Sequence, residues 1–263
     1  MHHIEMDDVT DEFFRCWDMA AKHLESKADG QINSWIRAIM MPPFLEHLSL
    51  RLGNQLFFIR IESVDGQVRT PGNPDGLLTI ADGCQGHACL MPMQLIRGEY
   101  GGQWQPVESG WGLIDARTRL PINPVALVTD ELIEMTDWEL QDFAVQVVRD
   151  HLLVQGREIM SFNSNPAVHP SIWFVGDDGP EWVSVGVVRY PLREAPLPAN
   201  LSELRTTFNR TGRPGHFASV AVANTKDPFD PNIATNGKYL PLYRGHGMYV
   251  NFTGLEPIVS LRE

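Results

Sequence analysis

Apolar side chains recur every three or four residues between positions 137 and 155, and this spacing predicts an amphipathic helix. Thr136 stands at the N-cap position, and Glu139 three residues later completes a capping-box pattern. Gly156 follows the last periodic position, where glycine commonly ends a helix. The apolar stripe consists of Leu140, Phe143, Ala144, Val147, Val148, His151 and Leu152. Strand-like runs follow the helix at residues 158–162, 171–175 and 182–190.

The remainder of the second half predicts one more helix and three more strands. A proline-containing linker at 192–200 leads into a short helix at 201–209. Residues 216–224 are apolar on both faces, which is typical of an interior strand. The chain then ends with a predicted pair of strands at 239–243 and 248–252.

The first half predicts a helical segment followed by a β-rich region. Residues 10–41 carry a helical spacing that is interrupted at Gly30, so we expect two helical pieces. Residues 44–130 predict strands separated by turns, with Pro92 placing its strand at an edge or a bend. Asp65-Gly66 is a hairpin signal. The strands expected in this region include 56–61, 77–80 and 90–96.

Together these patterns predict a mixed α/β protein of the α+β class. It should have a helical N-terminal segment, a β-rich first half, and a second half in which a sheet packs on the 137–155 helix. We place a boundary near Val128, which gives an N-terminal region 1–128 and a C-terminal region 129–263. No Ser/Gly-rich linker marks this boundary, so one continuous domain is an alternative. The sequence shows no internal repeat.

The charge of the chain narrows the classes of partner. The formal net charge is −12, from 21 basic and 33 acidic residues. Such a field repels nucleic acid and anionic membranes at long range. No apolar run approaches the roughly 18 residues of a membrane span, the N-terminus lacks an apolar signal core, and three cysteines do not suggest a disulfide framework. We therefore expect a soluble, cytoplasmic, acidic protein of bacterial type.

From Trp138 onward the predicted order is helix, three strands, helix, strand. This order resembles the core of the restriction-endonuclease-like, or PD-(D/E)XK, superfamily over residues 138–224. In that family an acid on the first helix, an Asp on the second strand and a (D/E)-X-K triplet on the third strand position a divalent metal. Converging carboxylates of this kind suit a hard cation, which lowers the pKa of a bound water.

Position by position, the resemblance implies a core without the metal site. The helix acid would be Glu139 or Asp142, and the Pro-Asp pair would fall at Pro170-Ser171, where serine is not a carboxylate. The triplet would fall within 183–187, which contains neither an acid nor a lysine. The resemblance therefore implies a catalytically degenerate nuclease-like core, suited to protein binding or to a scaffold role.

A second candidate site is the run from Asp82 to Cys89, which contains Cys84, His87 and Cys89. Two thiols and an imidazole can ligate zinc, although the spacing matches no common zinc module and no fourth ligand is near. Alternatively, Cys84 could be a nucleophile with a distant histidine as its base. The third alternative is that these cysteines are small buried residues of the core.

Two sets of basic residues are candidate binding sites. Arg244 and His246 lie among glycines, which would let the backbone present a histidine and an anion-clamping guanidinium. The other set is a run of arginines between 189 and 213, represented by Arg189, Arg193 and Arg205. For both sets the alternative is a solvated surface without a ligand.

The function that these observations favour is a non-enzymatic protein-interaction module, because no catalytic constellation is visible. The acidic charge suits a basic protein partner, and we expect no cofactor. One rival is a hydrolase that uses Cys84 or a metal site with Glu139. The other is a nucleic-acid binder that uses the arginines at 189–213, which the net charge argues against. The sequence does not indicate an oligomeric state.

Overall fold

The computed structural model describes residues 10–29, 32–37, 48–66, 68, 70, 74–98, 101–209, 214–227 and 239–258. The chain forms two compact units, one ending at Ile133 and the other beginning at Glu134, which we call unit 1 and unit 2. Four α-helices and two mixed sheets occur in the described residues. This arrangement confirms the predicted α+β class.

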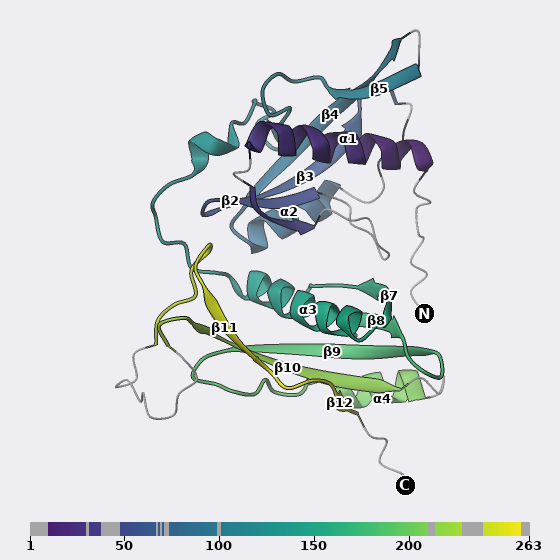
Figure 1. Cartoon of the computed structure of the whole chain (residues 1–263), viewed down its shortest axis with the longest axis vertical. Coiled ribbons are helices and arrows are strands. Elements are labelled where there is room, and N and C mark those ends of the chain that lie inside the picture. Colours follow the sequence, from purple (N-terminus) through teal and green to yellow (C-terminus); the bar gives the residue numbers. More distant parts are fainter. Residues whose placement is uncertain are drawn as a thin grey trace. The chain divides into compact units, whose positions relative to one another are not determined.

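Unit 1 is built on a sheet with the strand order β1-β2-β3-β4-β5. The first three strands form an antiparallel meander, a helix then connects β3 to its parallel neighbour β4, and β5 returns antiparallel to β4. A short sixth strand also pairs with β4. The elements are α1 (Asp11–Ala28), β1 (Ile32–Arg37), β2 (Leu48–Leu52), β3 (Gln55–Ser63), α2 (Pro74–Gly83), β4 (His87–Gly98), β5 (Gly101–Pro106) and β6 (Ile114–Asp115) (Figure 1).

Unit 2 is built on a sheet with the strand order β7-β8-β9-β10-β11. Its first three strands are an antiparallel meander, a helix connects β9 to its parallel neighbour β10, and β11 returns antiparallel to β10. A short last strand also pairs with β10. The elements are α3 (Asp137–Val154), β7 (Glu158–Phe162), β8 (Ile172–Val175), β9 (Pro180–Arg189), α4 (Leu201–Asn209), β10 (Gly215–Asn224), β11 (Met248–Phe252) and β12 (Glu256–Pro257).

The two units therefore share one topology, a helix, three strands, a crossover helix and three strands. The first helices correspond closely, since α1 and α3 each contain 18 residues and each begins after a threonine N-cap. They also bury side chains at the same spacing of three, one, three and four residues. These buried residues are Phe13, Cys16, Trp17, Ala20 and Leu24 in α1, and Gln141, Ala144, Val145, Val148 and Leu152 in α3. The structure thus repeats a fold although the sequence shows no repeat.

The helix predicted at 137–155 and its capping box are confirmed. The Thr136 hydroxyl accepts a hydrogen bond from the Glu139 backbone N–H at 3.3 Å, and the Glu139 carboxylate accepts one from the Thr136 N–H at 2.9 Å. Thr10 caps α1 in a similar way, because its hydroxyl accepts from the Phe13 N–H at 3.1 Å. Both caps satisfy donors that a helix leaves free in its first turn.

Each unit has its own hydrophobic core. In unit 1 the buried face of α1 packs with alternate residues of β3 and β4, which include Phe57, Ile59, Ile61, Cys89, Met91 and Met93. In unit 2 the buried face of α3 packs with alternate residues of β9 and β10, which include Val183, Val185, Ala218, Val220 and Val222. The predicted strands at 158–162, 171–175, 182–190 and 216–224 are confirmed, and so is the helix at 201–209.

Two predictions of element type are wrong. The second helical piece expected before Met41 is instead strand β1, and its β-branched and aromatic residues suit a strand as well as a helix. The strand expected at 77–80 lies inside α2, which has Pro74 as its first residue, a favoured position for proline. Residues 77–80 are three apolar residues and a threonine, which fit a buried strand or one face of a helix, so the pattern alone does not decide.

Three further predictions, for a hairpin, for an edge strand and for a terminal strand, are also wrong. The turn at Asp65-Gly66 leads into a crossover to a parallel strand and does not form a hairpin. Pro92 lies within β4, which is an interior strand because β3 pairs with one side of it and β5 and β6 pair with the other. Along β4, Pro92 falls between the residues that pair with β6 and those that pair with β5. Residues 239–243 form no strand beyond a single bridge between Tyr243 and Glu134.

Among the described residues, no helix combines the length and apolarity that a membrane crossing requires.

Candidate functional site

Both cysteines of the run at 84–89 lie in the interior of unit 1. Cys84 follows α2 and is 1 % exposed, and Cys89 on β4 is fully buried. Burial raises the pKa of the Cys89 thiol far above its ordinary value. The His87 ring stacks on Phe57 with 5.0 Å between centroids, and its Nε2 lies 3.0 Å from the Gln55 side-chain oxygen. Across the described part of the chain, no three His, Cys, Asp or Glu residues are grouped as a metal ion requires.

Glu139 and Arg244, two candidates for different sites, form one buried ion pair. Arg244 donates to Glu139 through Nε at 2.7 Å and through Nη2 at 2.9 Å. Their side chains are 1 % and 9 % exposed for the arginine and the glutamate. Glu139 also accepts from the Thr136 N–H and hydroxyl, so its carboxylate is surrounded by donors. The ion pair therefore attaches the segment after β10 to the first turn of α3. Its role is structural.

The other basic candidates that the structure describes have different surroundings. Arg189 forms an ion pair with Asp137 and donates to the Met135 carbonyl at 2.7 Å, so it also braces the start of α3. Arg193 is exposed on the segment after β9, and the side chain of Arg205 in α4 lies outside the described residues. His246 is exposed, with its ring 5.8 Å from that of Tyr243.

The remaining positions of the nuclease-like resemblance also hold structural side chains. Ser171, at the position of the family's Asp, is 1 % exposed and its hydroxyl accepts from the Val185 N–H at 3.2 Å. Asp142 is buried on α3 and accepts from the Gln146 side chain at 2.6 Å. These contacts join β9 to the start of β8 and brace one turn of the helix.

Sequence reasoning did not anticipate two histidine pairs in unit 2. Ser184 Oγ and His169 Nδ1 lie 2.9 Å apart, a distance that would suit a nucleophile and its base. Ser184 is, however, fully buried in the middle of β9, where a substrate has no access. His216 Nε2 lies 2.6 Å from Glu181 Oε2, and both side chains are mostly buried. No sequence spacing predicts either pair, because strand register brings these residues together.

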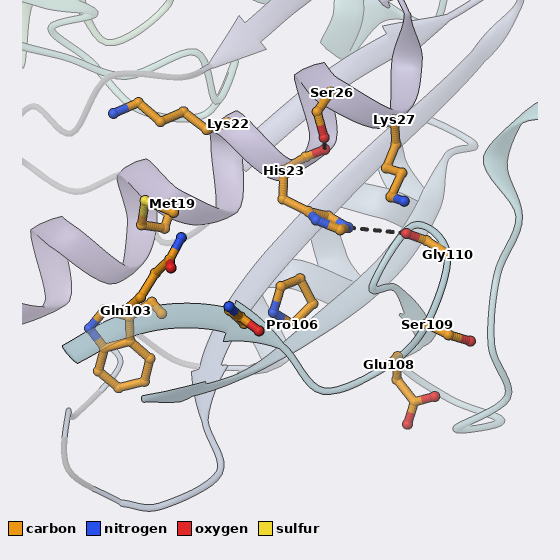
Figure 2. Close-up of a pocket in the computed structure, with 12 residues that line it drawn as sticks. Met19, Lys22, His23, Ser26, Lys27, Gln103, Pro106, Glu108, Ser109 and Gly110 are labelled. Carbon is orange, nitrogen blue, oxygen red and sulfur yellow. Dashed lines mark hydrogen bonds between the residues drawn. The ribbon is translucent and has the colours of Figure 1, made fainter. Parts of the chain in front are cut away.

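A cleft of about 440 Å³ opens in unit 1 between one flank of α1 and the strand β5, and we call it the α1–β5 cleft. His23 points from the helix toward the turn after β5 and donates from Nε2 to the Gly110 carbonyl at 3.1 Å (Figure 2). Burial is the largest cause that lowers the pKa of His23. The lining residues are Met19, Lys22, His23, Ser26 and Lys27 of α1, Gln103, Trp104, Gln105 and Pro106 of β5, and Glu108, Ser109 and Gly110.

The walls of the cleft are fixed by one contact within β5 and by a turn that follows it. Trp104 is buried and donates from its indole N–H to the Glu12 carboxylate of α1 at 2.7 Å. After β5 the chain turns through Gly112, which has a positive φ of 73°. A Cβ at Gly112 would lie 2.7 Å from that of Pro106, so the turn requires glycine. The cleft is therefore a feature of a well-packed part of unit 1.

A model of a domain of unknown function, DUF8840, matches residues 138–258. The match covers unit 2 from the first turn of α3 to the residue after β12. No curated protein and no solved structure matched the chain. The similarity therefore agrees with the extent of unit 2 and carries no statement about activity.

Proposed function

We propose that this protein is a non-enzymatic protein-interaction module that binds an extended segment of a partner. The observation that carries the proposal is the edge strand β11, with the sequence Met248-Tyr249-Val250-Asn251-Phe252. In the described residues it has a strand neighbour on one side, β10. Tyr249 and Val250 are 48 % and 38 % exposed.

An edge of this kind is unusual for a protein that stays alone. Natural sheets commonly protect their edges with lysine, proline or a charge, and β11 contains none of these. An extended peptide can pair with such an edge through its main chain, while side-chain contacts supply specificity. Aromatic anchors such as Tyr249 are enriched where proteins bind one another. The net charge of −12 favours the approach of a basic partner.

The candidates for chemistry support the same proposal, because they hold the fold together. Glu139 is saturated by Arg244 and by the cap of α3, and Cys84 is buried. The element order of residues 138–224 also agrees with a degenerate nuclease-like core, which we retain as a proposal for the origin of unit 2. Unit 1 has the same order of elements, so the order by itself is a weak sign of that family.

The test introduces the photo-reactive residue benzoylphenylalanine in place of Tyr249 in the full chain. Illumination in an extract of cells that make the protein should join it to one partner, which is then purified and titrated by calorimetry. The matched control carries the same residue at Leu192, an exposed position outside the strands. The proposal requires that the partner bind saturably to the benzoylphenylalanine variant without illumination. The binding should weaken in a variant that combines Tyr249→Lys and Val250→Lys.

The enzymatic rival is tested on the same preparation. Ester, peptide and phosphodiester substrates are supplied with Mg²⁺, Mn²⁺ or Zn²⁺, and turnover is compared between the parent chain and its Cys84→Ser and Glu139→Gln variants. Turnover that either substitution abolishes would replace the interaction module with a hydrolase. The nucleic-acid rival requires binding at low salt that falls steeply as salt is raised.

A further inference from the structure

We infer that the α1–β5 cleft of unit 1 binds an extended acidic peptide segment, with carboxylates two residues apart. The inference rests on the proposed function as a protein-interaction module and adds a second site, in unit 1, for an acidic segment, whereas the partner proposed for β11 is basic. It is carried by the shape of the cleft, the strand that forms one wall and the charges on the other wall.

The strand wall offers main-chain pairing. β5 is the last strand in the order of its sheet and, in the described residues, pairs with β4 alone. Gln103 and Gln105 are exposed and line the cleft, so their amides can donate to and accept from a bound peptide. Met19 and Pro106 add apolar surface beside them. A peptide that extends the sheet at β5 would lie along the flank of α1.

The helix wall offers positive charge. Lys22 and Lys27 are both exposed and line the cleft, against Glu108 as the carboxylate of the lining. Lys27 has no ion pair with a described residue, and Figure 2 shows it on the same side of the helix as His23. Lys22 pairs with Asp18 at 2.7 Å, but this pair is exposed and worth little, so an incoming carboxylate can replace Asp18. The local charge is thus opposite to that of the whole chain.

The spacing of the lysines favours a peptide over a small anion. Five residues of helix place their α-carbons about 7.5 Å apart along the axis. Side chains two residues apart on one side of an extended strand are separated by about 6.7 Å. One phosphate would contact both ammonium groups only if both side chains bent toward each other. The two lysines also lie about 140° apart around the helix axis, and Figure 2 shows Lys22 directed away from Lys27. The long Lys22 side chain therefore has to turn toward the cleft for two carboxylates of an extended chain to reach one lysine each.

The histidine at the corresponding helix position of unit 2 makes a different contact. The buried residues of α3 that precede His151 have the same spacing as those of α1 that precede His23, so the two histidines hold equivalent positions. The His151 ring makes an edge contact with Phe252 of β11, with 5.0 Å between the ring centroids. The two units have therefore diverged at equivalent positions, with an open cleft beside β5 and an aromatic contact beside β11. Unit 1 is the unit for which this site is inferred.

The experiment selects random dodecapeptides displayed on phage against the full chain, and then titrates fluorescein-labelled synthetic copies of the selected sequences by anisotropy. Selected peptides should contain two acidic residues separated by one residue. Lys27→Ala should weaken binding about tenfold, which is typical for the loss of one charge-assisted hydrogen bond. Arg15→Ala, which removes an exposed charge from α1 outside the lining of the cleft, should leave the affinity unchanged.

A charge reversal gives a second readout. The variant that combines Lys22→Glu and Lys27→Glu should reject the acidic peptides and bind copies in which the two acids are replaced by lysine. Acidic peptides that bind this variant as well as the parent chain would overturn the assigned site and leave the β11 proposal standing. The inference is also overturned if no peptide is enriched while inorganic phosphate binds in a Lys27-dependent manner. Loss of cross-linking at Tyr249 with intact peptide binding would instead overturn the β11 proposal alone.

Discussion

At the scale of single residues, the buried pair of Glu139 and Arg244 has the largest predicted effect on stability. Arg244→Ala leaves a carboxylate buried without its cation, and we expect a loss of about 3–5 kcal/mol in the free energy of unfolding of unit 2. Urea denaturation followed by circular dichroism measures this loss. Removing both partners should cost much less than the sum of the single changes, because no charge is then left unpaired.

A matched control separates burial from charge. Arg149 pairs with Asp150, whose carboxylate is 61 % exposed, and its guanidinium also lies 5.4 Å from the centroid of the Phe162 ring. Arg149→Ala should therefore cost about 1–2 kcal/mol, from a weak exposed ion pair and a cation–π contact. Equal losses for Arg149→Ala and Arg244→Ala would contradict the assignment of Glu139 and Arg244 to a buried structural pair.

The thiols provide a second test at the residue scale, and it bears directly on the rival nucleophile. Burial raises the pKa of the Cys16 thiol to about 12 and shifts that of Cys89 in the same direction. Cys84 is 1 % exposed. Because the thiolate is the reactive form, all three cysteines should react slowly with a disulfide reagent at pH 8 and rapidly in denaturant. Fast reaction of Cys84 with the disulfide reagent in the native protein would support the rival proposal of a hydrolase.

At the scale of elements, the caps of α1 and α3 allow equivalent positions of the two units to be compared. Thr10→Ala and Thr136→Ala each remove the acceptor of a first-turn N–H, at a cost of about 1 kcal/mol. We expect the larger loss at Thr136, because its hydroxyl also donates to the buried Glu139 carboxylate at 3.0 Å. Thr→Ser at either position should retain most of the stability. Thermal unfolding of the four variants measures the differences, and a larger loss at Thr10 would contradict this account.

Elements with local signals are those that the sequence predicts. α3 combines a capping box, a long apolar stripe and a terminal glycine, all between Thr136 and Gly156, and its bounds follow from them. The region of α2 offers three apolar residues and a threonine at 77–80, and the difference between a strand and a helix there depends on the parallel pairing of β3 with β4. That pairing joins residues that are distant in sequence, so a local pattern does not contain it.

The candidate sites follow the same division. Met19, Lys22, His23, Ser26 and Lys27 have the spacing of one helix flank, and the sequence contains that information. The position of β5 beside this flank comes from the tertiary packing of Trp104 against α1. Glu139 and Arg244 are separated by 105 positions, and no spacing rule connects them. Sequence reasoning therefore found both residues as candidates for chemistry and missed the pairing that explains them.

At the scale of the whole molecule, the shared topology predicts two units that unfold separately. Each unit contains a complete sheet, its own helices and its own hydrophobic core. Leu50→Ala in unit 1 and Val220→Ala in unit 2 truncate side chains that are at most 1 % exposed. Each should shift the denaturation midpoint of its own unit and leave the other unit unchanged, with losses of about 2–5 kcal/mol for Leu50→Ala and less for the smaller Val220→Ala.

The direct test expresses residues 134–263 alone and compares its amide NMR spectrum with that of the full chain. Because the internal contacts of unit 2 include every strand neighbour of β7 to β12 among the described residues, we expect the fragment to keep the resonances of α3 and of the sheet. It should bind the partner captured through Tyr249 and should not bind the acidic peptides selected on unit 1. A fragment that is unfolded would show that the two units form one cooperative domain, in which a binding event at the α1–β5 cleft would also change the stability of β11.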